Sequence, residues 1–94
     1  MKYLKYFENA MGTFDVSNKE LTSLINLNIP NHVTNFFAFH NKLTSLKYCP
    51  KTIGGSFICS HNKITSLEFS PKKVNGNFYC HDNHLTTLKG GPEY

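Results

Sequence analysis

The chain has 94 residues and a formal net charge of +4, with 39% hydrophobic and 14% aromatic residues. This length suits one domain, and the large apolar share excludes a disordered chain. All basic residues are lysines, and because arginine is best suited to bidentate recognition of phosphate and guanine, the composition disfavours sequence-specific reading of nucleic acid. No apolar stretch approaches the roughly 20 residues that span a bilayer, so we expect a cytoplasmic protein without a membrane partner.

The first residues, 1–12, lack the pattern that fills the rest of the chain. Tyr3, Leu4, Tyr6 and Phe7 have a spacing compatible with one or two helical turns. The end of a stack of repeats exposes apolar side chains that something must cover. We therefore expect residues 1–12 to form an N-terminal cap.

Residues 13–94 contain four copies of one pattern. The copies are FDVSNKELTSL from Phe14, FFAFHNKLTSL from Phe36, FICSHNKITSL from Phe57 and FYCHDNHLTTL from Phe78. In each copy Phe is followed two positions later by a smaller apolar residue, which is the period of a short strand with one buried face. We expect parallel strands whose phenylalanines form one buried row beside a row of smaller side chains, Val16, Ala38, Cys59 and Cys80.

Behind each strand the pattern predicts a bend and a return to the core. Asn41, Asn62 and Asn83 follow the strands, and an amide side chain can satisfy backbone groups that a bend leaves unpaired. The first copy has Lys19 at this position, so its turn is expected to be irregular or to use the neighbouring Asn18. The returning apolar pairs are Leu21 and Leu24, Leu43 and Leu46, Ile64 and Leu67, and Leu85 and Leu88.

The segments between the copies are short and contain one proline each, which excludes helices there. We expect extended or 3₁₀ segments, with Pro30, Pro50, Pro71 and Pro92 at the turns. How the chain enters the third and fourth strands is left open. The apolar residues Ile53 and Val74 lie one position earlier there than Val33 does in the second copy.

Val33, Phe36, Ala38, Asn41 and Leu43 match the pattern LxxLxLxxNxL, and the copies recur every 21 or 22 residues, within the range of roughly 20 to 29 for leucine-rich repeats. The chain thus resembles leucine-rich-repeat proteins, and is most similar to the short Phe-x-Cys-x-x-Asn-x-Leu-Thr-Ser-Leu repeats of bacteriophage and bacterial effector type. The resemblance implies an all-β-rich solenoid: a short leucine-rich-repeat arc over residues 13–94, with a parallel strand per repeat and an extended or 3₁₀ convex side.

The residue types that carry most chemistry do not form a recognised motif. Three cysteines without a CxxC pair indicate neither a disulfide scaffold nor a standard zinc site; Cys59 and Cys80 suit the buried row, and Cys49 is expected to be a surface thiol on the convex turn. The histidines near the bends are not spaced like zinc ligands, so a surface ladder is favoured over a metal centre: His40, His61, His81 and His84. We assign no catalytic residue and no cofactor, since Asp15 and Asp82 are the only acids on or beside the strands.

The outward-facing residues of the strands are the candidate site. Such a row is usually polar, but four neighbours here are apolar or aromatic, which marks an interaction surface unless a small protein simply tolerates exposed aromatics. We predict a protein-binding module that acts through this concave face and has no enzymatic activity. Its partner-binding residues are Asp15, Phe37, Phe39, Ile58, Tyr79 and His81.

The resemblance to phage repeats implies a partner, a bacterial host enzyme or defence protein that the chain would inhibit or modulate in the host cytoplasm. The alternative function is nucleic-acid binding through lysines and exposed aromatics. Lysine placement disfavours it, because most lysines fall on the bends and the convex side, away from the Phe37 and Tyr79 row: Lys42, Lys47, Lys51, Lys63, Lys72, Lys73 and Lys89.

The last predicted strand, Phe78–His81, lies at the edge of the expected sheet. Edge strands carry unpaired backbone groups that recruit another chain, and a closed two-fold pair is the commonest assembly. We expect a homodimer through this edge. The residues that would form it are Phe78, Tyr79, Cys80, His81 and Tyr94.

Overall fold

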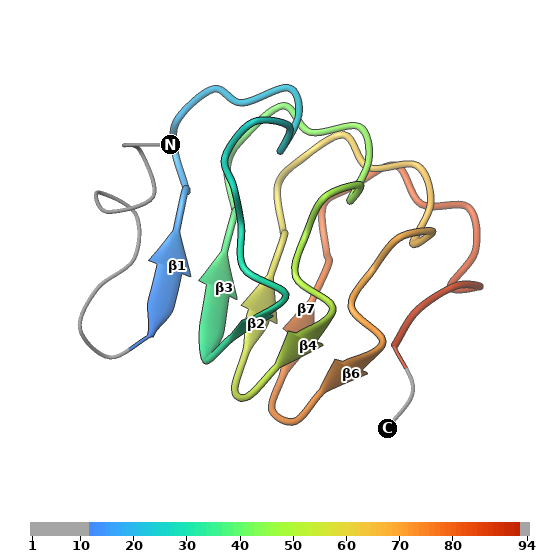
Figure 1. The fold of residues 1–94 in the computed structure, drawn as a ribbon. Coiled ribbons are helices and arrows are strands. Elements are labelled where there is room, and N and C mark those ends of the chain that lie inside the picture. Colours follow the sequence, from blue (N-terminus) through green and yellow to red (C-terminus); the bar gives the residue numbers. More distant parts are fainter. Residues whose placement is uncertain (1–11, 93–94) are drawn as a thin grey trace.

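The computed structural model describes residues 12–92, which form short strands joined by turns and contain no helix (Figure 1). The strands are β1 (Thr13–Asp15), β2 (His32–Val33), β3 (Asn35–Phe37), β4 (Thr52–Ile53), β5 (Phe57–Ile58), β6 (Lys73–Val74) and β7 (Phe78–Tyr79). They make two sheets in which every pairing is parallel. The prediction of a β-rich fold with parallel strands is confirmed. The predicted N-terminal cap lies outside the described residues apart from Gly12.

One sheet takes a strand from each copy of the repeat, in the order β1-β3-β5-β7. The register pairs Phe14 with Phe36, Phe36 with Phe57 and Phe57 with Phe78, as the alignment of the copies predicts. Backbone hydrogen bonds continue past the strands, because Val16 N donates to Phe37 O and Ala38 N donates to Ile58 O, both at 2.8 Å. Backbone hydrogen bonds therefore join neighbouring copies along the strands and through the residues that follow them.

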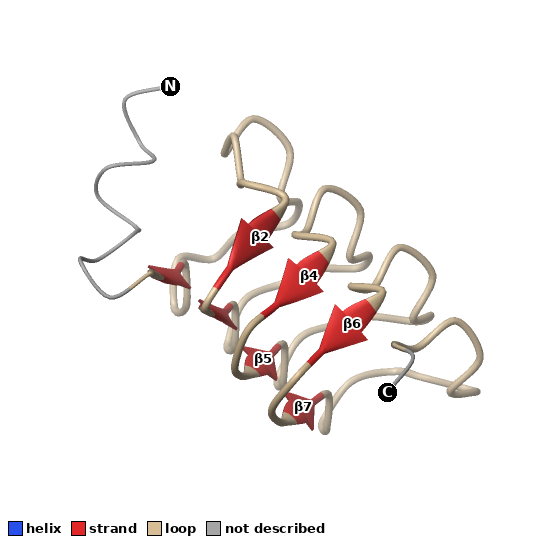
Figure 2. Cartoon of the chain, turned by 60° about the horizontal axis from the view of Figure 1, so that its bottom comes forward, coloured by secondary structure: helices blue, strands red, loops and turns tan. Residues whose placement is uncertain are grey.

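The strands β2, β4 and β6 form a second sheet, which is seen as a separate row of arrows in Figure 2. Its register pairs Val33 with Ile53 and Ile53 with Val74, and all three side chains are buried. Of the two forms predicted for this side, extended or 3₁₀, residues 12–92 show the extended one. The reason is local, since β-branched side chains favour extended backbone and the neighbouring copies supply ladder partners.

The corner between the two sheets explains the irregular spacing before the third and fourth strands. Val33 lies three positions before Phe36, whereas Ile53 and Val74 lie four positions before their phenylalanines. The third copy meets the shorter second copy here through Gly55 N, which donates to Thr34 O at 2.6 Å. The fourth copy has the same spacing as the third, and Gly76 N donates to Gly55 O at 2.8 Å. A Cβ atom on Gly76 would lie 2.6 Å from that carbonyl oxygen, so this close approach of two backbones requires glycine.

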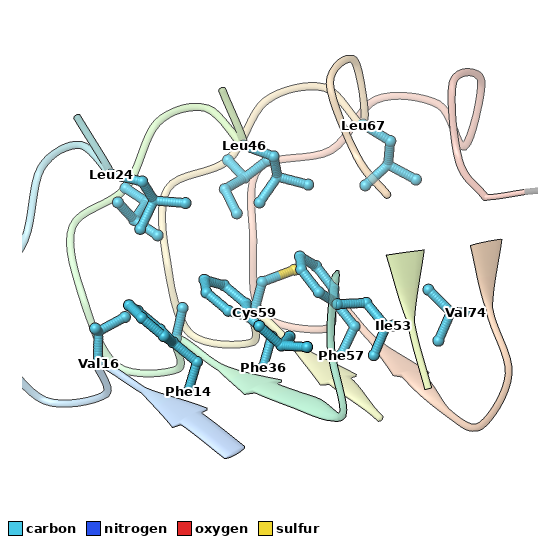
Figure 3. Packing of buried hydrophobic residues seen from close by; sticks show 14 residues of the cluster. Phe14, Val16, Leu24, Phe36, Leu46, Ile53, Phe57, Cys59, Leu67 and Val74 are labelled. Atoms are coloured by element: carbon cyan, nitrogen blue, oxygen red, sulfur yellow. The ribbon is translucent and has the colours of Figure 1, made fainter. Parts of the chain in front are cut away.

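The core consists of rows of like side chains stacked across the copies (Figure 3). The rings of Phe14, Phe36, Phe57 and Phe78 stack with centroid distances of 5.9, 5.3 and 5.2 Å, and the first three are fully buried. Offset stacking of aromatic rings adds to the free energy of burial. The second row, Val16, Ala38 and Cys59, is also fully buried. The burial of both predicted rows is thus confirmed for the first three copies.

The fourth copy is buried less than the copies before it. Phe78, Cys80 and Leu85 are only partly buried, and Leu88 is 72% exposed, whereas the equivalent Leu67 is 2% exposed. The prediction that Leu88 returns to the core is therefore wrong. Each copy is covered by the copy that follows it, and within residues 12–92 none follows the fourth.

The asparagines after the strands serve the backbone of two copies at once. Asn62 Nδ2 donates to Ala38 O at 2.8 Å and to Cys59 O at 3.0 Å, while its Oδ1 accepts from Leu43 N at 2.9 Å. Asn41 makes the same bonds one copy earlier, and Asn83 one copy later. Their predicted structural role is confirmed.

The hydrogen bonds of Asn41 also explain how the turn of the first copy is stabilised. Because each asparagine reaches back to the preceding copy, Lys19 N and Leu21 N both donate to Asn41 Oδ1, at 3.0 and 2.9 Å. The turn is therefore satisfied from the second copy and not by Asn18, which is exposed. Both amides are therefore paired, although position 19 is a lysine and not an asparagine.

We predict that Phe36→Ala lowers the free energy of unfolding by about 3–5 kcal/mol, because it opens a cavity in the middle of the ring stack. Urea denaturation followed by circular dichroism measures the loss. The matched control is Phe37→Ala, which removes the same ring from the partly buried outer side of the same strand and should cost clearly less. Equal losses in the two variants would contradict the full burial of Phe36 and the partial burial of Phe37.

Candidate interaction surface

The outer side of the four-stranded sheet presents one side chain per copy. Since successive residues of a strand point to opposite faces, the buried phenylalanines place their C-terminal neighbours outward. The register makes these neighbours adjacent: Asp15 pairs with Phe37, Phe37 with Ile58, and Ile58 with Tyr79. We call these four residues the outer row.

The outer row is polar at one end and apolar along the rest. Asp15 and Tyr79 are exposed, Tyr79 by 43%, while Phe37 and Ile58 are partly buried. Asp15 Oδ1 accepts a hydrogen bond from Ser17 N at 2.9 Å, so this carboxylate already closes a local turn. The surface offered to a partner is therefore mainly the apolar stretch from Phe37 to Tyr79.

A second set of side chains flanks the outer row two residues further along each copy. Phe39 is partly buried, and its ring lies 6.4 Å from that of Phe37. His81 is exposed beside Tyr79, and its Nδ1 lies 3.1 Å from Ser60 Oγ. The structure thus places the predicted residues along one sheet face, with Asp15 on β1 at one edge and His81 just beyond β7 at the other.

The bends that follow the strands carry three of the four predicted histidine-ladder members. His40 and His61 stack with ring centroids 4.3 Å apart and an angle of 4° between their planes. His61 and His81 are 5.2 Å apart in an edge-to-face arrangement. The predicted proximity of His40 and His61 is confirmed.

Two cysteines lie where the repeat pattern put them, and one does not. Cys59 is fully buried and Cys80 partly buried in the second core row. Cys49 was expected to be a surface thiol, but it is partly buried against the core, and its Sγ lies 3.1 Å from Phe69 O in the next copy. Desolvation by burial raises the pKa of Cys49 to about 12, and raises the pKa values of Cys59 and Cys80 as well.

A groove that sequence reasoning missed lies on the turns that lead into β2, β4 and β6. It has a volume of about 1020 Å³, and no residue of the outer row lines it. The exposed aromatic rings of Tyr48 and Phe69 contribute to it, with exposed fractions of 48% and 54%. Lys47, Lys51 and Lys72 lie along the same groove.

The backbone explains why these two aromatics face solvent. Tyr48 and Phe69 have φ angles of 77° and 72°, a left-handed conformation that bulky residues rarely adopt. Asn26 and Gly90 occupy the same position in the first and last copies, with φ angles of 68° and 92°. Asn26 and Gly90 were the signal in the sequence for a left-handed backbone at this position, since asparagine and glycine favour that conformation.

The expected separation of charge from aromatic rings concerned the row of Phe37 and Tyr79, and the groove holds a different pair of rings. Lys47 Nζ lies 5.4 Å from the centroid of the Tyr48 ring and 5.9 Å from that of Phe69. These are cation–π distances. The separation therefore does not hold for the aromatic pair in the groove.

No helix long and apolar enough to cross a membrane occurs in the part of the chain that the structure describes. Comparison with known proteins gives no match: no family model, no curated protein and no solved structure is similar to this chain at a significant level.

We predict that the three thiols of the folded protein react in the order of their exposure. At pH 8 an alkylating reagent should modify Cys80 first, because the raised pKa values and burial of Cys49 and Cys59 keep both as neutral, shielded thiols. Mass spectrometry of the peptides over time gives the three rates, and the unfolded protein in urea is the control. Modification of Cys59 as fast as Cys80 would contradict the core register.

Proposed function

We propose that the chain is a short leucine-rich-repeat-type solenoid that acts as a protein-binding module and not as an enzyme. Support for this architecture comes from the stacking of the copies, since the same positions pair strand by strand in both sheets. Repeat proteins of this kind bury each repeat against its neighbours and use the extended strand surface for binding.

The observation that carries the binding function is the outer row with Phe39 beside it. Phe37, Ile58 and Tyr79 lie on three adjacent strands in register, so their side chains form a continuous apolar surface and not scattered exposed residues. Contiguous apolar surface on a small protein marks an interaction site, and Tyr and Phe are enriched at interface cores. The partner surface should be apolar where it meets this stretch.

The partner class rests on the resemblance of the repeats alone. Phage repeats of the form seen at Phe57, Cys59 and Asn62 point to a bacterial host enzyme or defence protein as the partner, which the chain would inhibit or modulate in the host cytoplasm. An active site is not proposed, because the single acid of the outer row, Asp15, is engaged by Ser17 N.

A second candidate function is favoured by the groove. Three lysines and two exposed aromatic rings line it together, which is the combination that binds single-stranded nucleic acid by charge and stacking. Without arginine, such binding would not read sequence. It would weaken steeply as salt rises, unlike a complex held by the apolar outer row.

We also propose that the chain self-associates at the end formed by β7. Among the described residues β7 is an edge strand, and the side chains of Phe78, Cys80 and Leu88 beside it are incompletely covered. A second copy that pairs its own β7 antiparallel would cover both edges at once.

The binding proposal predicts that Tyr79→Asp abolishes capture of a bacterial partner while the melting temperature stays near that of the wild type. A charge at the centre of an apolar interface is desolvated without a partner, whereas on the free surface it stays hydrated. The experiment is a pull-down from bacterial lysate, followed by measurement of affinity with the purified partner.

The matched control is Tyr48→Asp, which changes an equally exposed tyrosine in the groove. It should leave protein capture intact, and aspartate tolerates the left-handed backbone there. If Tyr48→Asp removes binding, Tyr79→Asp does not, and the complex dissociates steeply with salt, the groove is the site and nucleic acid is the better candidate.

The self-association proposal predicts a dimer by light scattering at micromolar concentration and a monomer for Leu88→Lys. Leu88 is the most exposed large apolar residue of that end, so the substitution should remove apolar contact area without destabilising the fold. Asp15→Lys, on the opposite edge strand β1, is the control and should stay dimeric. A monomeric wild type would refute the proposal.

A further inference from the structure

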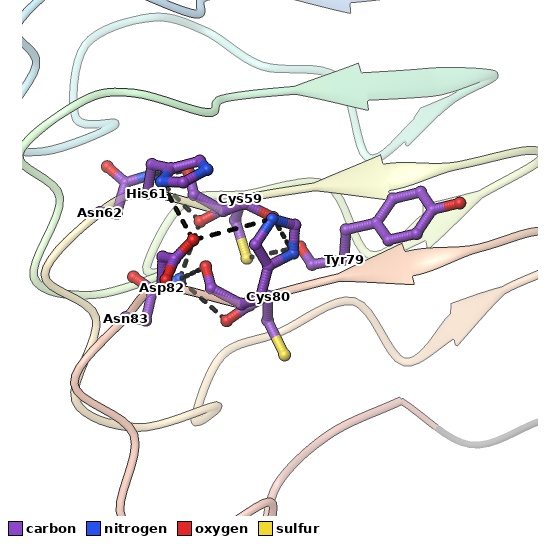
Figure 4. Close-up of polar contacts among 9 residues, drawn as sticks. Cys59, His61, Asn62, Tyr79, Cys80, Asp82 and Asn83 are labelled. Carbon is purple, nitrogen blue, oxygen red and sulfur yellow. Dashed lines mark hydrogen bonds and ion pairs between the residues drawn. The ribbon is translucent and has the colours of Figure 1, made fainter.

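Two histidines and an aspartate from the third and fourth copies converge just beyond β5 and β7 (Figure 4). His61 Nδ1 lies 3.3 Å from Asp82 Oδ2, and His81 Nε2 lies 4.0 Å from the same oxygen. All three potential ligand atoms are within 4.8 Å of one another. Sequence comparison of equivalent positions could not reveal this group, because His81 and Asp82 occupy different columns of the repeat.

The backbone of the bends holds two of these side chains in place. His61 and Asp82 are equivalent residues of neighbouring copies, with left-handed φ angles of 58° and 56°. His61 N also donates to His81 O at 3.1 Å, which ties the two bends together. The stack of His40 on His61 sets the plane of the His61 imidazole. The geometry therefore follows from the same register that builds the core.

Ser60 orients the second histidine. Its side chain is buried, with 2% exposure, and its Oγ lies 3.1 Å from His81 Nδ1. A neutral imidazole that donates from Nδ1 to this hydroxyl keeps the lone pair on Nε2, the nitrogen on the Asp82 side. A hydrogen bond of this kind, from the far nitrogen of an imidazole, is the usual outer support of a metal ligand.

We propose that His61, His81 and Asp82 bind a divalent transition metal ion of the zinc class, with water completing the coordination. Two imidazole nitrogens and a carboxylate oxygen are a ligand set suited to zinc and similar ions, whereas magnesium and calcium prefer oxygen ligands alone. Bonds of roughly 2.0–2.2 Å to a tetrahedral ion put ligand atoms about 3.4 Å apart. The 3.3 and 4.0 Å separations from Asp82 Oδ2 lie on either side of this value. The two imidazole nitrogens lie within 4.8 Å of each other, and rotation of the exposed side chains can bring them closer.

A simple ion pair explains less of this arrangement. Asp82 Oδ2 is within ion-pair distance of His61 Nδ1, at 3.3 Å, but its 4.0 Å separation from His81 Nε2 is too long for a hydrogen bond. His81 nevertheless points this nitrogen at the carboxylate, supported by Ser60 from behind. A metal ion between the three ligand atoms would give His81 Nε2 a partner. The Cys80 sulfur points away from Asp82 in Figure 4 and is not part of the site.

The test is calorimetric titration of the full chain with Zn²⁺ and, separately, with Mg²⁺. We expect one Zn²⁺ bound per chain and no binding of Mg²⁺. His61→Gln and Asp82→Asn should each weaken Zn²⁺ binding at least about tenfold, and Ser60→Ala by about tenfold through loss of the oriented nitrogen. The imidazole proton resonances of His61 and His81 should shift on addition of the ion, and circular dichroism confirms that each variant folds.

The matched controls are His84→Gln and Cys80→Ser, which remove another histidine and the nearest accessible thiol of the fourth copy. Both should bind Zn²⁺ like the wild type. Absence of Zn²⁺ binding would overturn the proposal. Unchanged Zn²⁺ binding in both His61→Gln and Asp82→Asn would also overturn it. Loss of Zn²⁺ binding in Cys80→Ser would overturn it too, since the ion would then be bound by the thiol.

Discussion

The amide groups of Asn41, Asn62 and Asn83 impose the constraint on which the other features depend. Each amide donates to backbone carbonyls of its own copy and of the preceding copy, and accepts from an amide of the preceding copy. A buried bend without these bonds would leave several polar groups unpaired, at a cost of roughly 1–3 kcal/mol each. The bonds can form only when neighbouring copies are in register. Strand pairing and ring stacking share that register, so the three interactions reinforce one another.

Because the copies are stacked in register, the residues at each repeated position lie next to one another in a line. The residue types in each line determine the surface features. The inward line is uniformly Phe and the outward line runs from Asp15 to Tyr79. Two further lines have left-handed backbone, one through His40, His61 and Asp82 and one through Tyr48 and Phe69. In the first the residue types suit the conformation, whereas in the second bulky aromatic residues occupy a backbone conformation that they rarely adopt. Backbone strain of this kind is concentrated at functional sites, which is why the groove is retained as a candidate.

The sequence predicted those parts of the structure in which one position repeats with one residue type. The phenylalanine row, the smaller row and the asparagines were predicted because their spacing is regular and their chemistry has one use. The sheet β2-β4-β6 was missed because strands of two residues show no period, and because Ile53 and Val74 are out of step with Val33. Cys49 and Leu88 were misplaced because burial depends on the next copy, which a single repeat does not describe. The aromatic groove was missed because Tyr48 and Phe69 lie in the segments between the copies, where the repeated pattern assigns no role to individual side chains.

The three surface features call for partners with different chemistry, because the net charge of +4 is unevenly placed. No residue of the outer row lines the groove that holds three of the lysines, so a complex on the proposed outer-row site would rest on apolar contact and depend weakly on salt. The groove combines Lys47, Lys51 and Lys72 with two rings and attracts an anion whose binding salt would screen. His81 joins the outer row to the proposed metal centre, since it stands beside Tyr79 and faces Asp82. A bound divalent ion would add positive charge at that end of the row, opposite Asp15. The two ends of the apolar stretch would then differ in sign, which fixes the direction in which an asymmetric partner can lie across the strands.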